Sequence, residues 1–350
     1  MSSARRILAV DVGTGTQDIL VYDPARPMEN CEQLVLPSPT VLVAHQIRQA
    51  TAARRPVHLV GPLMGGGPCV RAVREHLAAG LAVFATSSAA RTIRDNLDEV
   101  RALGVQIKEE PVEGAQVVRT GDVDPPLLRE VLGRFAVALP EEWAVAVQDH
   151  GECLQGSNRE VRFRFWRDFV AGGGDLKALA FREPPPLFTR MRAVQEIVPG
   201  AVVMDTAAAA VWGALADEEV AARAEEEGAI IVNLGNGHTL GALVQGERLW
   251  GLFEHHTRLM TGERISAYLS ALRSGTLRDE EVRAEGGHGA YIHPAFSAGE
   301  KAFRFVAVTG PQRHLVKGCG FYLAAPYGNM MLTGCFGLLR ASSRCAEFGR

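Results

Sequence analysis

The sequence predicts an α/β protein made of two related halves, each with a mixed β-sheet covered by helices. Apolar strand-like segments alternate with helix-like segments along the first 150 residues, which is the pattern of sheets packed against helices. One strand-and-turn pattern occurs twice, at residues 7–18 and at residues 229–240, with an offset of 222 residues. A chain of 350 residues is also long enough for two domains.

The composition narrows the class of protein. Apolar residues make up 47% of the chain and charged residues 22%, as in globular rather than disordered proteins. The 37 basic and 40 acidic residues give a net charge of -3, which leaves no basic excess for a nucleic-acid backbone. Because no apolar run approaches the roughly 18 residues of a membrane-spanning helix, we expect a cytoplasmic protein without a membrane or nucleic-acid partner.

The alternating pattern gives the following elements in chain order. Strands are expected at residues 6–10, 57–60, 81–85 and 143–147. Helices are expected at residues 40–54, 69–78, 89–103 and 125–135. A glycine run at 172–174 and a triple proline at 184–186 interrupt the pattern in the middle of the chain. We therefore expect one domain at residues 1–199 and a second at residues 200–350.

The two copies of the repeat share a glycine turn. Each copy has an apolar strand, one polar residue (Asp11 or Asn233), a Gly-x-Gly turn and a second apolar strand. The turn glycines are Gly13 and Gly15 in the first copy and Gly235 and Gly237 in the second. Glycine lets backbone N–H groups approach an anion without a Cβ in the way. Two such turns facing each other could hold a polyphosphate, although either turn alone is equally well an ordinary hairpin.

Five segments resemble, in order along the chain, the superfamily of actin, Hsp70 and sugar kinases. They are the first phosphate loop at 11–16, a connecting helix at 204–214, the second phosphate loop at 233–239, an adenosine-contacting turn at 305–311 and a second connecting helix at 326–341. The resemblance implies a duplicated actin-like, ribonuclease H-like fold with a nucleotide cleft between two mixed-sheet domains. It also implies ATP and Mg²⁺ as cofactors, and phosphoryl transfer, where positioning and charge stabilisation provide most of the catalysis.

The resemblance assigns roles to individual residues. Asp11 would hold the hydrated magnesium ion. The phosphates would contact Gly13, Thr14, Gly15 and Thr16 in the first loop, and Asn233, Gly235, Asn236, Gly237 and Thr239 in the second. Thr309 and Gly310 would contact adenosine. Many relatives have an acidic residue at the position of Asn233. Because this chain has an asparagine there, the second loop would bring no second carboxylate to the metal.

Asp205 is the main candidate for a catalytic base. It follows the apolar strand at 201–204 and precedes an alanine-rich helix, and in sugar-kinase relatives an Asp in this context accepts the proton of the substrate hydroxyl. The alternative is that Asp205 caps the helix beginning at Thr206, which is a common role of Asp. Asp149, at a strand end, and His238, inside the second phosphate loop, are the further catalytic candidates.

Within the superfamily, the chain resembles a prokaryotic family labelled as pyruvate formate-lyase activating enzymes. The resemblance lies at residues 11–23, 65–68, 148–151 and 157–159. The six cysteines are scattered and lack the C-x3-C-x2-C run that radical-SAM activases use for their cluster, so the label does not imply that chemistry. The pattern fixes no role for the cysteines, for the glycine loop at 65–67, or for His255, His256, His288 and His293. These histidines, with Glu254, could be metal ligands, but their spacing matches no standard site.

Three functions stay open at this point. The expected one is a small-molecule kinase with an unknown acceptor, because Asp205, the connecting helix and the second loop follow one another as in sugar kinases. The second is an ATPase that activates a partner redox or radical enzyme, in which cysteines of a homodimer could hold a cluster. The third is a nucleotide-sensing module, which a loss of metal binding through Asn233 would favour.

Overall fold

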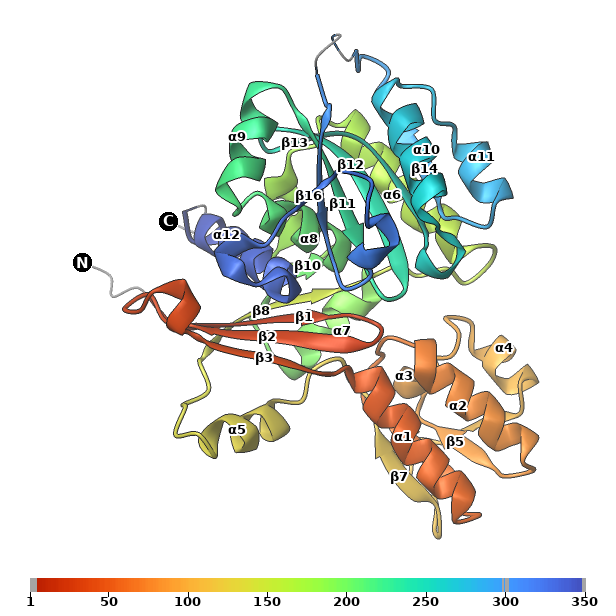
Figure 1. The fold of residues 1–350 in the computed structure, drawn as a ribbon. Helices are drawn as coiled ribbons and strands as arrows, with labels where there is room; N and C mark the ends of the chain where they lie inside the picture. Colours follow the sequence, from red (N-terminus) through yellow and green to blue (C-terminus); the bar gives the residue numbers. More distant parts are fainter. Residues whose placement is uncertain (1–4, 298, 300–301, 348–350) are drawn as a thin grey trace.

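The computed structural model describes residues 5–297, 299 and 302–347, with side chains up to residue 343. In this part of the chain the strands form two sheets of six strands and one of four (Figure 1). None of the helices in the described ranges combines the length and the apolar character needed to span a membrane.

The first sheet carries the first copy of the repeat. Its strands are β1 (Ile7–Val12), β2 (Thr16–Tyr22), β3 (Glu32–Pro37), β8 (Glu142–Val147), β9 (Ala180–Phe181) and β10 (Val202–Asp205), in the order β3-β2-β1-β8-β10-β9. Strand β1 pairs antiparallel with β2 and parallel with β8; β3 is antiparallel to β2, and β10 is parallel to β8. From Leu8 to Val12 every residue of β1 is buried, as expected of a strand covered on both faces.

The second sheet repeats this arrangement. Its strands are β11 (Ala229–Leu234), β12 (His238–Gln245), β13 (Arg248–His256), β14 (Gly289–Ile292), β15 (Phe305–Thr309) and β16 (Tyr322–Leu323), in the order β14-β13-β12-β11-β15-β16. Strands β11 and β12 are antiparallel, as are β12 and β13, while β15 is parallel to both β11 and β16. The order and direction of β11, β12, β13, β15 and β16 therefore match those of β1, β2, β3, β8 and β10 in turn. The predicted duplicated actin-like fold is confirmed.

Two helices join the halves. Helix α8 (Thr206–Ala214) and helix α12 (Thr333–Glu347) cross next to β1 (Figure 1). A Cβ on Gly213 would overlap the carbonyl oxygen of Thr333, and a Cβ on Gly337 would overlap that of Ala209. The backbones of the two helices thus touch, which only glycine permits at these positions.

The second connecting helix begins later than predicted. Residues 326–332 form two 3-10 turns, η5 (Pro326–Gly328) and η6 (Met330–Leu332), and the α-helix starts at Thr333. Between them, the Asn329 side chain accepts a hydrogen bond from the N–H of Met331. The first connecting helix lies where the sequence predicted it.

A third sheet lies between β3 and β8 in the chain. Its strands are β4 (Val57–Val60), β5 (Val83–Ala85), β6 (Val105–Ile107) and β7 (Gln116–Arg119), all parallel, in the order β6-β5-β4-β7. Its helices are α1 (Pro39–Ala52), α2 (Gly67–Ala78), α3 (Ser87–Ala90) and α4 (Leu97–Ala102). It has its own apolar core and sits beside the end of the first sheet (Figure 1). The sequence predicted β4, β5, α1 and α2, but not β6 or β7, nor that these strands form a separate sheet.

The remaining elements cover the two large sheets. The helices are α5 (Pro125–Gly133), α6 (Asn158–Ala171), α7 (Thr189–Ile197), α9 (Glu218–Glu226), α10 (Gly262–Arg273) and α11 (Asp279–Ala284). The other 3-10 turns are η1 (Met28–Asn30), η2 (Leu176–Leu179), η3 (Thr257–Leu259) and η4 (Arg313–Val316).

One predicted helix is wrong. The segment 89–103 is not one long helix but the end of α3, a turn, and α4. The break occurs because Asn96 caps a new helix by accepting a hydrogen bond from the N–H of Asp98. In the turn between α3 and α4, the Asp95 carboxylate accepts a hydrogen bond from the N–H of Cys153 at 2.9 Å. The domain division after residue 199 stays a prediction; strand β10, just beyond it, pairs in the first sheet.

Candidate functional site

The two glycine turns have the same backbone geometry. The N–H of Gly13 donates to the carbonyl of Thr16 at 2.9 Å, and the N–H of Gly235 donates to the carbonyl of His238 at 3.0 Å. Each bond closes the hairpin between the first two strands of its sheet. The repeat seen in the sequence is therefore a repeat of structure.

The two turns also face each other. A Cβ on Gly15 would lie 2.9 Å from the side-chain nitrogen of Asn236, and a Cβ on Gly237 would lie 2.9 Å from the hydroxyl of Thr14. The second glycine of each Gly-x-Gly turn thus lies against a side chain of the opposite turn. This is the arrangement predicted for two loops that hold one polyphosphate.

A cavity of about 590 Å³ lies against both turns. Of the predicted phosphate-binding residues, it is lined by Gly13, Thr14, Asn233, Gly235, Asn236 and Gly237. Gly15, Thr16 and Thr239 do not line it; the Thr239 hydroxyl is buried against that of Thr257, at 3.0 Å. The glycine loop at 65–67, to which the sequence assigned no role, forms part of the wall.

Asp11 is buried and does not line the cavity, and a Cβ on Gly334 of helix α12 would overlap its Oδ2. Asp11 faces Asp18 across the β1–β2 pair, and the Oδ1 atoms of both carboxylates are buried without a hydrogen-bond partner among the described residues. Burial, together with the charge of Asp18, raises the pKa of Asp11 well above its usual range, and burial raises the pKa of Asp18 to about 7. Carboxylate oxygens that lack a protein donor are fitting ligands for Mg²⁺, the ion that the fold implies.

The predicted adenosine residues lie away from the cavity. The Thr309 hydroxyl is 2.9 Å from that of Thr333 and is buried. Gly310 has a positive φ of 99° and lies so close to the second loop that a Cβ would be 2.7 Å from Oδ1 of Asn233. Neither residue lines the cavity, and their role toward adenosine stays a prediction.

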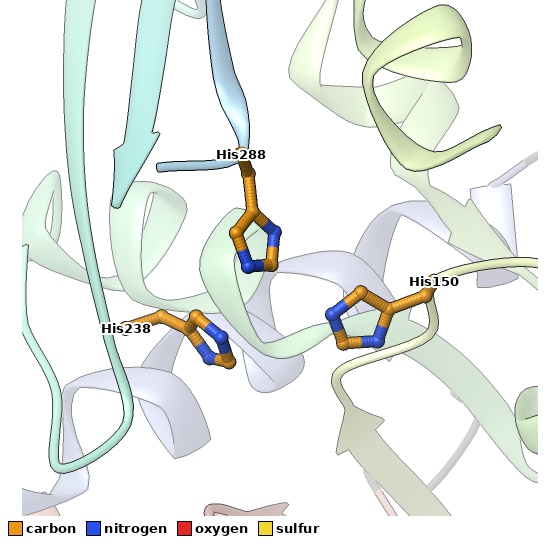
Figure 2. A group of neighbouring side chains, drawn as sticks. All are labelled: His150, His238 and His288. Atoms are coloured by element: carbon orange, nitrogen blue, oxygen red, sulfur yellow. The ribbon is translucent and has the colours of Figure 1, made fainter. Parts of the chain in front are cut away.

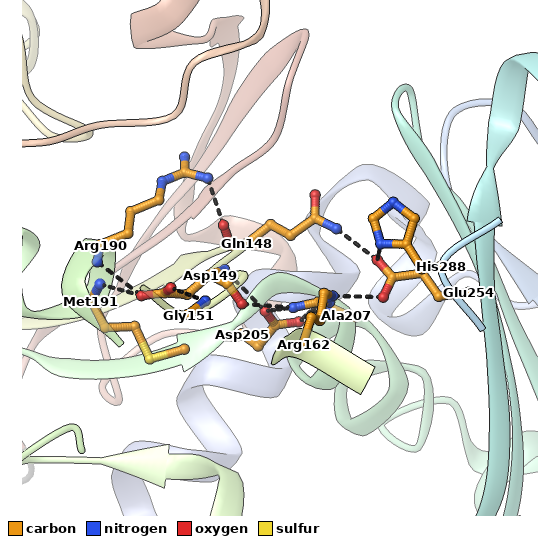
Figure 3. Close-up of polar contacts among 10 residues, drawn as sticks. All are labelled: Gln148, Asp149, Gly151, Arg162, Arg190, Met191, Asp205, Ala207, Glu254 and His288. Atoms are coloured by element: carbon orange, nitrogen blue, oxygen red, sulfur yellow. Dashed lines mark hydrogen bonds and ion pairs between the residues drawn. The ribbon is translucent and has the colours of Figure 1, made fainter. Parts of the chain in front are cut away.

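Asp205 has both carboxylate oxygens occupied (Figure 3). Its Oδ1 accepts the N–H of Ala207 at 2.9 Å and Nη2 of Arg162 at 3.0 Å. Its Oδ2 accepts Nη1 of Arg162 at 2.8 Å and the N–H of Asp149 at 3.2 Å. Asp205 therefore caps helix α8 and pairs with a buried arginine. These four donors favour the structural role, and proton transfer by Asp205 stays a prediction.

Asp149 is engaged in a similar way (Figure 3). Its Oδ1 accepts the N–H of Gly151 at 2.8 Å, and its Oδ2 accepts the N–H groups of Arg190 and Met191, both at 2.9 Å. The latter two belong to the first turn of helix α7, where a carboxylate is favourable. Burial raises the pKa of Asp149. Asp149 lines the cavity, but its carboxylate oxygens accept hydrogen bonds from backbone N–H groups of the protein.

Arg162 connects the two halves. Its Nε donates to Oε2 of Glu254 at 2.6 Å, while its other nitrogens bind Asp205. All three side chains are almost fully buried. Burial opposes the charge of Glu254, but Arg162 holds the pKa of that carboxyl well below its usual range. Arg162 could not be singled out from the sequence, because helix α6 contains several arginines and no pattern distinguishes the buried one.

Three histidines converge at the edge of the cavity. His150 follows strand β8, His238 begins strand β12, and His288 precedes strand β14. One ring nitrogen of each lies within 4.8 Å of those of the other two (Figure 2). Burial lowers the pKa of all three, that of His288 to about 3. The sequence singled out His238 but left His288 without a role, since the three positions show no ligand spacing.

The other histidines without a predicted role do not belong to this group of three, although the ring of His256 lies 5.0 Å from that of His238 and 4.8 Å from that of His288. His255 is buried, with its ring tilted against that of Tyr268 at a centroid distance of 5.9 Å. His256 has Nε2 at 3.1 Å from Nη2 of Arg159. His293 accepts the N–H of Ala295 at 3.1 Å. Of their ring nitrogens, Nε2 of His255 is buried without a hydrogen-bond partner among the described residues.

The cysteines form no cluster within the described residues. Cys31, Cys69 and Cys335 are buried, Cys153 is partly buried and Cys319 is exposed, and all five are free thiols. Burial raises the pKa of Cys69 to about 12. The side chain of Cys345 lies outside the described residues. A cluster held by cysteines of a homodimer stays a prediction.

Comparisons with known proteins give remote structural likenesses. A Bacteroides thetaiotaomicron protein of unknown function with an actin-like ATPase fold is 9% identical over 95% of this chain and 96% of that one, with a TM-score of 0.37. An exopolyphosphatase from Cytophaga hutchinsonii is 10% identical over 89% and 68%, with a TM-score of 0.31. The ethanolamine utilization protein EutJ from Carboxydothermus hydrogenoformans is 11% identical over 96% and 89%, with a TM-score of 0.27. The fold assignment rests on strand order and pairing, not on these superpositions.

The sequence comparisons give a family. No curated protein matches the chain. One family model matches residues 64–315, which is more than half of the chain. The chain therefore belongs to the family described as "Putative pyruvate format-lyase activating enzyme (DUF1786)".

Proposed function

We propose that the protein binds Mg-ATP at its two facing turns and transfers the γ-phosphate to a small molecule held in the cavity. The main support is the matched pair of turns. Each turn is closed by the same backbone hydrogen bond, from Gly13 to Thr16 and from Gly235 to His238. Backbone N–H groups of such turns are suited to phosphate oxygens. The cavity between them, at about 590 Å³, is within the roughly 300–1,000 Å³ of small-molecule sites.

The charges of the cavity support an anionic acceptor. Arg71, in the first turns of α2, and Arg258, in η3 after β13, both line the cavity. Both are exposed, and neither has an ion-pair partner among the described residues. The guanidinium group binds carboxylates and phosphates through paired hydrogen bonds. We infer that the acceptor carries a carboxylate or a phosphate.

Asp11 is the proposed magnesium ligand. Its buried Oδ1 has no other partner among the described residues, and Asp18 lies opposite on the neighbouring strand. When bound, the ion would neutralise phosphate charge during transfer. The chain's own contribution is to fix the phosphates with the two turns and to exclude water with the surrounding sheets.

The family description gives a second candidate function, an ATPase that activates a partner enzyme. The two candidates share nucleotide binding and differ in what stimulates turnover. A small anionic metabolite should stimulate a kinase and be consumed, whereas an activator should turn over ATP in response to a protein. A protein that binds nucleotide without any turnover would instead be the nucleotide sensor.

Calorimetry and thermal unfolding with Mg-ATP test the proposal. A ligand that binds only the folded state stabilises it by about 2.7 kcal/mol at a hundredfold excess over Kd, so the melting temperature should rise by several degrees. Gly237→Val should abolish the rise, because its side chain enters the space between the turns, where Thr14 lies 2.9 Å from the Cβ position.

Gly133→Val is the matched control, since a Cβ on Gly133 at the end of α5 meets nothing within 4 Å. It should keep the full response to Mg-ATP. An unchanged melting temperature of the wild-type protein with every nucleotide tested would contradict the proposal. A full response of Gly237→Val would remove the second turn from the binding site.

A further inference from the structure

We propose that His150, His238 and His288 bind a transition-metal dication such as Zn²⁺ or Fe²⁺, with one coordination position open to the cavity. Nothing in this inference depends on nucleotide binding. It rests on the convergence of the three rings, on the lack of other partners for them, and on the carboxylate behind one of them.

The three rings come from separate parts of the chain. They belong to the loop after β8 in the first sheet and to β12 and the loop before β14 in the second. Their potential ligand atoms lie within 4.8 Å of one another, and Figure 2 shows the rings turned toward a common point. Around a tetrahedral ion with metal–nitrogen bonds of about 2.1 Å, the nitrogens would be about 3.4 Å apart. Small side-chain rotations are enough to reach that distance.

The imidazoles lack hydrogen bonds. None of the three rings has a side-chain hydrogen bond to any described residue, and Nδ1 of His288 is buried without a partner. His288 is only 2% exposed. Buried polar groups in proteins are almost always hydrogen-bonded, and the nearest charged group to Nδ1 of His288 is Oε1 of Glu254 at 3.9 Å. Nε2 of His288 and the rings of His150 and His238 at the cavity wall therefore remain available to a metal ion. Imidazole nitrogens suit Zn²⁺, Fe²⁺, Ni²⁺ and Cu²⁺.

Glu254 supports the orientation of His288. Its Oε1 lies 3.9 Å from Nδ1 of His288 and is held there by Gln148, while Arg162 holds its Oε2 (Figure 3). A carboxylate behind a histidine is the usual outer partner of a metal-bound imidazole. With Nδ1 facing Glu254, Nε2 of His288 is the atom available to a metal. Glu254 is thus a positioning residue.

The site opens toward the cavity. His150 and His238 both line it, and His288 closes the site from behind. Three protein ligands with a free position are typical of metal sites that bind a substrate or water. The ligand atoms also distinguish this site from the proposed magnesium site at Asp11, because Mg²⁺ prefers oxygen ligands whereas transition metals accept nitrogen ligands.

Metal loading tests the proposal directly. The full chain is stripped with chelator, loaded with Zn²⁺ or Co²⁺, freed of excess metal and analysed by elemental mass spectrometry. We expect one equivalent of either metal, and visible absorption of the Co²⁺ form that indicates low-coordinate nitrogen ligation. Millimolar Mg²⁺ should leave the bound metal in place.

Substitutions identify the ligands. His150→Gln and His238→Gln, at the cavity wall, should each weaken Zn²⁺ binding by more than the about 10- to 100-fold that loss of an outer partner costs. His256→Gln is the matched control, because its ring lies 5.0 Å from that of His238 but is engaged by Arg159. Circular dichroism and thermal unfolding of the metal-free proteins show that each variant is folded.

Three results would overturn the proposal. The first is wild-type protein that retains no stoichiometric Zn²⁺ or Co²⁺ after loading. The second is displacement of the metal by Mg²⁺. The third is equal loss of binding in folded His150→Gln, His238→Gln and His256→Gln, which would mean that metal binds by general surface attraction.

Discussion

The two glycine turns have the same backbone but different side chains. Shifting the first turn by 222 residues places Asn233 at the position of Asp11, His238 at that of Thr16 and Leu240 at that of Asp18. The first turn therefore brings buried carboxylates, while the second brings an amide, an imidazole and an apolar residue. The two turns therefore share the course of their backbone and differ in the chemistry of their side chains.

The strongest way to break this arrangement is to remove the residue that binds both halves. Arg162→Leu leaves Asp205 of the first half and Glu254 of the second as buried charges without their partner. We expect a loss of about 3–5 kcal/mol in the free energy of unfolding, the usual cost of breaking a buried ion pair. Chemical denaturation measures it.

Arg164→Leu is the control on the same helix, at an exposed position. It should change the free energy of unfolding by no more than about 0.5 kcal/mol. Equal stability of the two variants would mean that Arg162 does not hold the halves together.

A second way is to separate the crossing helices. In Gly213→Ala the new methyl group overlaps the backbone of Thr333, so we expect a loss at or above the upper end of the about 1–3 kcal/mol typical of overpacking. Gly133→Ala, where the methyl group meets nothing within 4 Å, should be neutral or slightly stabilising. A Gly213→Ala protein as stable as the wild type would show that the crossing is loose.

A third change distinguishes the two interpretations of Asp205. Asp205→Asn keeps the helix cap but weakens the pairing with Arg162, and should cost about 1.5–3 kcal/mol, the range for a hydrogen bond to a charged group. If the role is structural, turnover per folded molecule should stay within about tenfold of the wild type. A loss of about 10²–10⁴ in turnover, with stability and nucleotide affinity unchanged, would restore Asp205 as the base.

The smallest expected effect on stability comes from exchanging the two turns' polar residues. Asp11→Asn gives the first turn the side chain of the second, and should remove the dependence of nucleotide affinity on Mg²⁺ while leaving metal-free binding unchanged. The reciprocal Asn233→Asp should add to that dependence. Titration of nucleotide with and without chelator measures both. Equal losses of affinity in the two buffers would make Asp11 a turn residue only.

The repeat could be predicted because its signals are local. Strand, turn and strand follow one another within 7–22 and 229–245, and their apolar patterns identify them without knowledge of the rest of the fold. The break in the predicted helix 89–103 also has a local cause, the cap of Asn96 on the N–H of Asp98, which the apolar pattern alone does not show. The contact of Asp95 with Cys153 is the part that depends on a segment far away in the chain.

The candidate site was predictable only in part for the same reason. The glycines of the turns are visible in the sequence, but the engagement of Asp205 depends on Arg162, 43 residues earlier. The histidine cluster depends on three segments that meet only when β8, β12 and β14 are in place. No spacing rule joins His150 to His288, since the contact is made by the packing of the two sheets.

The equal offset of both hairpin strands has a consequence for insertions. Strands β1 and β2 and strands β11 and β12 begin at positions that differ by the same 222 residues, so the first strand and the turn have the same length in both hairpins. The connection between β3 and β8, residues 38–141, meanwhile took in an entire parallel sheet, whereas its counterpart, residues 257–304, did not. The two halves therefore differ in the length of a peripheral connection and agree in the spacing of the turns, so an insertion between Gly13 and Thr16 or between Gly235 and His238 should disturb the facing loops far more than one of equal length within residues 38–141.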